Sequence, residues 1–329
     1  MNAVGWGAFL AALLTGWALL DGAVQGGAQL ARGIAGRDDP RRRTVLAAIG
    51  PYLLLGEVWL VAAAGVLLAA FGHVEAELWA AGYPLVVALL IAWVVRDAAL
   101  WLRSRLSAPR WRAAWDRALE AASLALPAAF GALLGVAWIR FGGADDAIAA
   151  MPPMTATVVT VVVPVLLASL SAACARVHGG LVVAQRAPTG LSAAARRRVR
   201  VALVPAAALA TLMALAALGL ATLGATTALA AAGILLAMAA VALAARFELD
   251  RAAVTHPVLA WVGGAAVTAP VLATASVVGP GVVGAAAPAQ VLNDLTVPVL
   301  AAALVVVVAQ ALAWRVLLRP LGPRTVVFF

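Results

Sequence analysis

Lysine is absent from the 329-residue chain, and cysteine occurs once, at Cys174. A single cysteine excludes an intramolecular disulfide and any metal centre built from cysteine pairs. The nucleotide-binding loop Gly-x-x-x-x-Gly-Lys-Ser/Thr requires a lysine, so primary ATP-driven transport by this chain alone is excluded. Charged residues make up only 11% of the sequence, whereas a soluble domain carries about 25%. The surface of the folded chain must therefore face an apolar medium.

Apolar residues take the place of the missing charge, at 65% of the chain with a mean hydropathy of +1.04. A helix needs about 20 apolar residues to cross the hydrocarbon of a bilayer, and runs such as 155–175 meet this requirement. The sequence thus predicts an all-α integral membrane protein, with residues 1–329 forming one polytopic domain. The expected spans are 5–31, 45–71, 77–102, 118–141, 155–185, 199–221, 226–245, 257–278 and 295–318. The first run lacks a preceding basic residue and a clear cleavage site, so we expect it to be retained as a helix.

The net charge of +9 comes from 23 arginines set against 14 acids. All arginines except Arg96, Arg140 and Arg176 lie at or after the ends of the first, third, fifth, seventh and ninth spans. Short basic clusters between apolar runs are typical of topology signals rather than of a nucleic-acid surface. The positive-inside rule then places the N-terminus outside and the C-terminus in the cytoplasm. Nine spans are required to keep this alternation in phase.

Ionisable residues within the spans cost about 2.5–3.5 kcal/mol each on insertion scales, so each calls for an explanation. For Arg96, snorkelling or an ion pair with an acid such as Asp21 competes with a chemical role. Glu57 falls near midspan, where either a proton-carrying role or structural pairing fits. His178 has no suitably spaced partner ligand, which favours structural hydrogen bonding over metal or haem ligation. No metal site is predicted.

Several short segments follow one another in a characteristic order and spacing. They include Leu20-Asp21-Gly22, Ile49-Gly50-Pro51, Glu57-Val58-Trp59-Leu60, Pro109-Arg110-Trp111-Arg112 and Val177-His178-Gly179. Together these segments resemble subunit II of the cytochrome bd quinol oxidases, and Arg96 and Arg103 keep the spacing of two arginines in that family. The resemblance covers the first four spans and extends more weakly into the fifth, about half of the chain.

Five positions depart from the family pattern, one of them Trp101, which stands in place of the acid of the third-span motif. Val24 replaces the second acid of the first motif, and the second motif has lost a tryptophan, an aspartate and an asparagine. The residues at those three positions are Leu53, Leu54 and Gly56. In the family, that aspartate is linked to proton delivery toward the haem site. The resemblance therefore implies that the proton path is altered in this chain.

The resemblance implies two four-helix bundles plus one peripheral helix, in the inner membrane of a bacterium. It implies a haem-free subunit that supports quinol oxidation and oxygen reduction by subunit I, the partner that carries haems b and d. This chain alone would bind no cofactor, apart from a structural quinone. Trp59 would line a route for oxygen, and Asp21 and Glu57 would be the remaining membrane acids. Arg96, Arg103 and His178 would be structural polar residues.

Two other functions remain open from the sequence. In a proton-coupled secondary transporter, Asp21 and Glu57 would couple proton movement to that of a substrate, although nine spans do not suit two equal inverted repeats. A degenerate paralogue would keep the partner-binding surface without any role in turnover. A haem-ligating subunit encoded by the neighbouring gene would favour the oxidase.

Overall fold

The computed structural model describes residues 1–249 and 256–317. Within this part of the chain, nine helices are long and apolar enough to cross a membrane, which confirms the predicted fold class. A tenth helix, α5 (Asp145–Ala149), is too short to do so. The long helices are α1 (Ala3–Ala35), α2 (Asp39–Ala70), α3 (Gly72–Leu102), α4 (Pro109–Phe141), α6 (Pro153–Arg186), α7 (Thr189–Thr222), α8 (Ala228–Glu248), α9 (His256–Gly284) and α10 (Ala289–Leu317).

Several helices begin earlier than the apolar runs alone predict. Helix α2 begins at Asp39 rather than at residue 45, after Asp38 accepts a hydrogen bond from the backbone N–H of Arg41 (3.1 Å). Helix α4 begins at Pro109 rather than at residue 118, and proline is favoured in the first helical turn. A 33-residue helix is about 50 Å long, whereas the hydrocarbon is about 30 Å thick. The apolar runs therefore mark the hydrocarbon portion of each helix, and arginine-rich turns extend beyond it.

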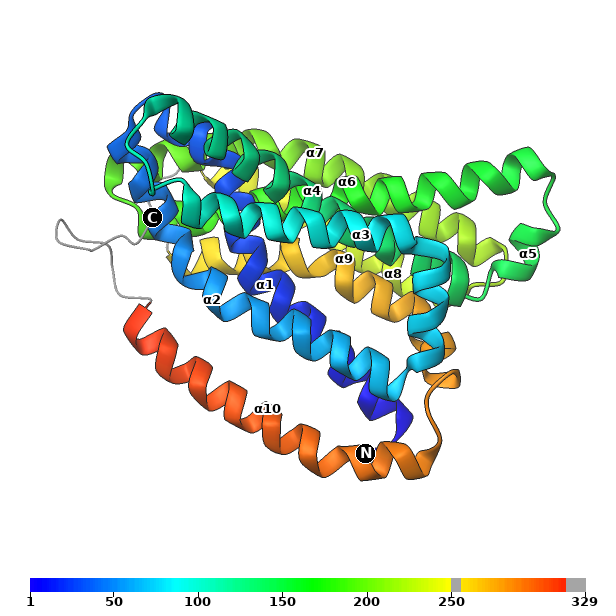
Figure 1. Ribbon diagram of the computed structural model, residues 1–329. Helices are drawn as coiled ribbons and strands as arrows, with labels where there is room; N and C mark the ends of the chain where they lie inside the picture. The colour runs from blue at the N-terminus through cyan, green and yellow to red at the C-terminus, as the bar shows by residue number, and fades with distance from the viewer. Residues whose placement is uncertain (250–255, 318–329) are drawn as a thin grey trace.

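The long helices form two bundles and one outlier (Figure 1). Helices α1 to α4 pack together, as do α6 to α9, and the two bundles meet where α1 and α4 contact α6 and α9. Helix α10 lies at the side of the first bundle and contacts α2 and α1 at few points (Figure 1). This arrangement agrees with two four-helix bundles plus a peripheral helix.

Glycines bring α1 and α6 into backbone contact at the centre of the molecule. A Cβ atom added to Gly26 would lie 1.7 Å from the carbonyl oxygen of Ala175. One added to Gly179 would lie 2.1 Å from the backbone nitrogen of Gly27. Membrane helices associate through such close packing because lipid supplies no hydrophobic drive between them. His178 directly precedes Gly179 in this contact, and a Cβ atom added to Gly22, the neighbour of Asp21, would lie 3.7 Å from the His178 ring carbon Cδ2.

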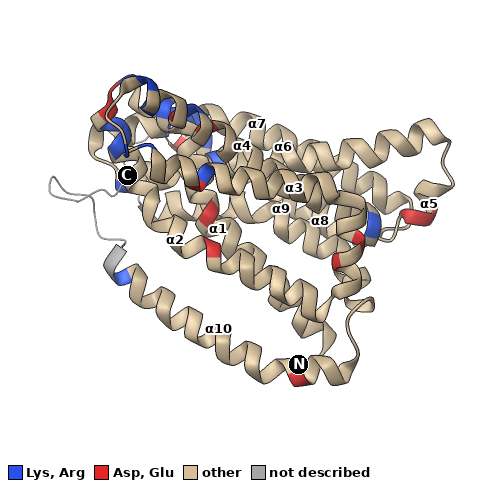
Figure 2. Ribbon diagram, in the orientation of Figure 1, with Lys and Arg blue, Asp and Glu red and all other residues tan. Residues whose placement is uncertain are grey.

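Most arginines of the described chain lie at one end of the bundles, where α1 ends and α4 begins (Figure 2). The N-terminus lies at the opposite end (Figure 2). The charge asymmetry inferred from the sequence is thus a spatial property of the fold.

Candidate functional site in the membrane interior

A buried ion pair joins α1 to α3. Arg96 and Asp21 are 0% and 1% exposed, and Arg96 Nη1 donates a hydrogen bond to Asp21 Oδ1. The other carboxylate oxygen accepts a hydrogen bond from Gln25 Nε2 at 2.6 Å. Of the roles considered for Arg96, the structure shows the ion pair with Asp21. Because both of its oxygens are engaged, the Asp21 carboxylate is held in one position.

The same guanidinium reaches two further acids. Arg96 Nε donates to Asp97 Oδ1 at 2.8 Å, and Nη2 lies 3.9 Å from Glu57 Oε1. The side chains of Asp97 and Glu57 are 24% and 36% exposed. The site therefore runs from a sealed ion pair inside the bundle to two carboxylates at its lateral surface. One cation faces three carboxylates, an arrangement that can hold a proton between the outer two.

The residues that depart from the family pattern occupy three different environments beside this site. Leu53 is buried in the core, at 1% exposed, whereas Leu54 is 56% exposed on the outer face of α2. A Cβ atom added to Gly56 would lie 3.0 Å from the backbone nitrogen of Asp21. An asparagine at position 56 would therefore push α1 and α2 apart, so glycine here permits the close approach that seals Asp21.

Trp59 packs against α1 and borders an apolar cavity. A Cβ atom added to Gly16 would lie 2.2 Å from the indole Cε3 atom of Trp59. The cavity has a volume of about 630 Å³ and lies between α1, α2 and α10, with Trp6 also in its wall. Trp6 Nε1 donates to the backbone carbonyl of Leu292 at 3.2 Å, which fastens the start of α10 to α1. The cavity can hold an apolar solute.

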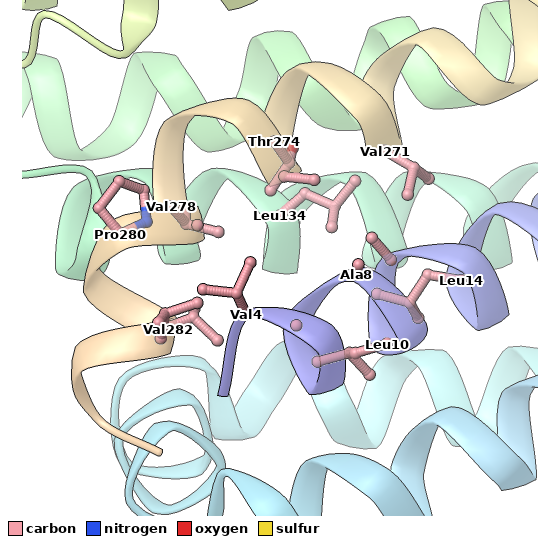
Figure 3. A pocket seen from close by; sticks show the side chains of 15 residues that line it. Val4, Ala8, Leu10, Leu14, Leu134, Val271, Thr274, Val278, Pro280 and Val282 are labelled. Carbon is pink, nitrogen blue, oxygen red and sulfur yellow. The ribbon is translucent and has the colours of Figure 1, made fainter. Parts of the chain in front are cut away.

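A second apolar cavity, of about 440 Å³, lies between α1, α4 and α9 (Figure 3). Thr274 is the polar side chain labelled in its wall (Figure 3). Its hydroxyl accepts a hydrogen bond from Trp138 Nε1 and donates one to the carbonyl of Pro270, both at 2.8 Å. With that hydroxyl engaged on both sides, this cavity also suits apolar occupants.

His178 joins three helices and is poorly placed to bind a metal. Its Nε2–H donates to the carbonyl of Leu19 at 2.8 Å. On the other side, a Cβ atom added to Gly263 would lie 2.8 Å from Nδ1. No group of three His, Cys, Asp or Glu side chains that could hold a metal ion occurs within residues 1–249 and 256–317. With Nε2 bonded to Leu19 on α1 and Nδ1 beside Gly263 on α9, His178 is placed as a hydrogen-bonding residue between helices.

Arg103 belongs to a separate ionic network at the arginine-rich end. It is 0% exposed and donates through Nε to Asp116 Oδ1 at 2.6 Å and through Nη2 to Asp39. Arg42 also donates to Asp116, and Arg112 donates to Asp39 at 2.9 Å. The network ties the ends of α2, α3 and α4 together. The sequence singled out Arg103 but gave no site role to Asp39 or Asp116, whose position inside arginine-rich segments was the available signal.

Comparison with a protein family covers nearly the whole chain, whereas comparison with individual relatives covers a shorter stretch. The family model described as cytochrome bd terminal oxidase subunit II matches residues 2–317, well beyond the half of the chain in which the motifs were recognised. The chain is 32% identical to cytochrome bd-I ubiquinol oxidase subunit 2 of Escherichia coli strain K12 over 130 residues, 40% of this chain and 34% of that protein. It is 30% identical to cytochrome bd ubiquinol oxidase subunit 2 of Bacillus subtilis strain 168 over 128 residues, 39% of this chain and 38% of that protein.

The aligned stretch spans only a little over a third of the length of these curated relatives. The family model, by contrast, extends from the second residue into the end of α10. Fold, helix number and family match agree with one another. The chain belongs to the cytochrome bd terminal oxidase subunit II family.

Proposed function

We propose that this chain is the haem-free subunit II of a bd-type quinol:oxygen oxidoreductase and works only in complex with a haem-bearing subunit I. Family membership supports the assignment. The observation that carries it is the opening of the Asp21–Arg96 site onto the side of the bundle through Glu57 and Asp97. A carboxylate facing lipid at this depth is costly, so a protein partner is needed to cover it.

The surface around these two acids suits such a partner. Large apolar side chains are exposed along α2 at Leu54, Val61 and Leu68, which recur at intervals of seven residues and so share one face. Helix α3 adds Val94, at 68% exposed, beside Asp97. An apolar face interrupted by two partly exposed carboxylates matches a protein surface with complementary polar groups better than it matches lipid.

In this proposal the chemistry belongs to the partner, whose haems b and d would supply electron transfer and oxygen reduction. This chain would contribute positioning and apolar space. The cavity beside Trp59 would admit oxygen, a small apolar solute, and could also receive the prenyl chain of a structural quinone. A secondary transporter is less well supported because Asp21, one of its two coupling acids beside Glu57, is sealed and has both carboxylate oxygens hydrogen-bonded.

Purification with and without the partner tests the proposal. Expressed with a candidate subunit I, the tagged chain is expected to copurify stoichiometrically with haem, whereas the chain alone should show no Soret band. A stoichiometric Soret band in the isolated chain would contradict the haem-free assignment. Failure to copurify with any haem-bearing subunit encoded in the same genome would contradict the complex.

Glu57→Gln tests whether the outer carboxylate carries protons. Three polar or aromatic family residues near it are already replaced, so we expect oxygen consumption by the complex to fall by no more than about twofold. Glutamine keeps the shape of the side chain, and its amide oxygen can accept a hydrogen bond, but it carries no titratable proton. The measurement is quinol-driven oxygen uptake, with assembly checked by haem content. A tenfold loss with haem content intact would make Glu57 a proton carrier, and Leu54→Asp should then raise turnover.

We further propose that the arginine-rich end faces the cytoplasm of a bacterial cell, with the N-terminus outside. The basis is the excess of arginine at that end (Figure 2) and the positive-inside rule. A reporter active only in the cytoplasm should give signal when fused after Arg43, Arg112 or Arg198. Signal after Gly143 or Gly284 would reverse the orientation.

A further inference from the structure

A basic recess lies on the side of the molecule where α1, α4 and α6 meet. It has a volume of about 420 Å³ and belongs neither to the Asp21–Arg96 site nor to the Arg103 network. Three arginines and one acid border it, together with a buried amide and two apolar side chains. The lining residues are Gln29, Arg32, Arg117, Glu120, Ala121, Leu124 and Arg176.

Gln29 holds Arg176 at the recess. The Gln29 side chain is 6% exposed, and its Nε2 donates to the carbonyl of Ser123 at 2.8 Å. Its Oε1 accepts a hydrogen bond from Arg176 Nε at 3.0 Å. Because Arg176 uses Nε for this bond, the two Nη groups of the guanidinium are left for another acceptor. The position of the charged group is thus fixed by the fold.

The recess carries more positive charge than its own acid can neutralise. Arg32 pairs with Glu120 at 2.9 Å. Neither Arg117 nor Arg176 has a carboxylate partner within the described residues. With three arginines and one glutamate, the recess has a net charge of +2, which favours an anion.

The depth of the recess matches the headgroup region of a bilayer. Helices α1, α4 and α6 are 33, 33 and 34 residues long, or about 50 Å each, so about 10 Å of each extends past the hydrocarbon at either end. Arg117 lies eight residues, about 12 Å, from the start of α4 at the arginine-rich end. Leu124, 43% exposed, lies two turns deeper on the same helix. A charged group at the headgroup boundary and an apolar surface below it therefore form one continuous site.

We infer that this recess binds the phosphodiester headgroup of an anionic phospholipid, with the phosphate between Arg117 and Arg176 and an acyl chain along Leu124. Guanidinium groups bind phosphate oxygens through charge-assisted hydrogen bonds, and basic pockets between membrane helices on the cytoplasmic side bind such headgroups. A free phosphate ion offers the same anionic oxygens but has no acyl chain to lie on Leu124.

The test uses the full-length chain purified in a neutral detergent. Phosphatidylglycerol should raise the midpoint of thermal unfolding and appear as a bound lipid by native mass spectrometry. Arg117→Gln should weaken the apparent affinity about fivefold, the effect of one arginine near a membrane surface. Glu120→Gln should change it in the opposite direction because it removes a competing carboxylate. Arg105→Gln, an exposed arginine outside the recess, is the matched control and should bind as the wild type does.

Three results would overturn the inference. Equal stabilisation by phosphatidylcholine would show that the headgroup charge is not recognised. Equal stabilisation by inorganic phosphate would assign the recess to the free anion instead of a lipid. An equal loss in Arg105→Gln and Arg117→Gln would reduce the effect to the net charge of the surface. Because Arg117 is exposed and has no described ion pair, its replacement should leave the chain folded.

Discussion

Arg96→Gln should destabilise the folded chain by about 3–5 kcal/mol, the range for removing one partner of a buried ion pair. The loss follows from Asp21, which is 1% exposed and would remain as a carboxylate without its cation. Losing the cation would cost less at Asp97 and Glu57, because their side chains are 24% and 36% exposed rather than sealed inside the bundle. Thermal unfolding of the purified chain in detergent measures the effect.

A double variant separates the ion pair from other contributions of Arg96. Asp21→Asn combined with Arg96→Gln removes both buried charges and keeps groups able to hydrogen-bond, so it should recover most of the lost stability. Arg37→Gln, at an exposed turn, is the charge-matched control and should unfold as the wild type does. If the double variant is no more stable than Arg96→Gln, pairing with Asp21 is not what holds Arg96 in the core.

Much of the fold can be predicted from the sequence because membrane-spanning helices have a simple sequence pattern. Each span needs a long apolar run, and the arginine clusters fix how the runs alternate. The ends of the helices were harder to predict from the sequence. Residues 39–44 form the first turns of α2 but carry arginine and aspartate, so hydropathy assigns them to a loop. A cap at Asp38 and a network around Arg103 stabilise these turns, and neither contributes to hydropathy.

The site was only partly predictable for a different reason. Asp21, Glu57 and Arg96 stand out because each charge is costly inside a span. That the two acids converge on the Arg96 guanidinium depends on how closely α1, α2 and α3 approach one another. Gly56 sets part of that approach, yet in the sequence it is one of 29 glycines in the chain. Gln25 and Gln29 were missed because neutral amides give little signal, although each positions a charged group.

The contact between α1 and α6 should be about as sensitive to substitution as the ion pair. Gly26→Ala places a methyl group 1.7 Å from the carbonyl oxygen of Ala175 and 2.5 Å from its carbonyl carbon. Overpacking a core costs about 1–3 kcal/mol when side chains can shift, and occasionally more. Here the obstacle is backbone, so the two helices must separate. We expect the chain to unfold during extraction or to lose at least ~3 kcal/mol of stability.

Gly233→Ala is the matched control, since a Cβ atom added there meets nothing within 4 Å. The same substitution in an open helical position should be neutral or stabilising by about 0.5–1 kcal/mol. Gly179→Ala should behave like Gly26→Ala, because its Cβ atom would lie 2.1 Å from the backbone nitrogen of Gly27. The measurements for all three variants are the yield of protein that stays folded in detergent and its unfolding temperature. Separation of α1 from α6 would also break the bond from His178 to Leu19 and displace Asp21 from Arg96. If Gly26→Ala and Gly233→Ala had the same unfolding temperature, the two bundles would not depend on this contact.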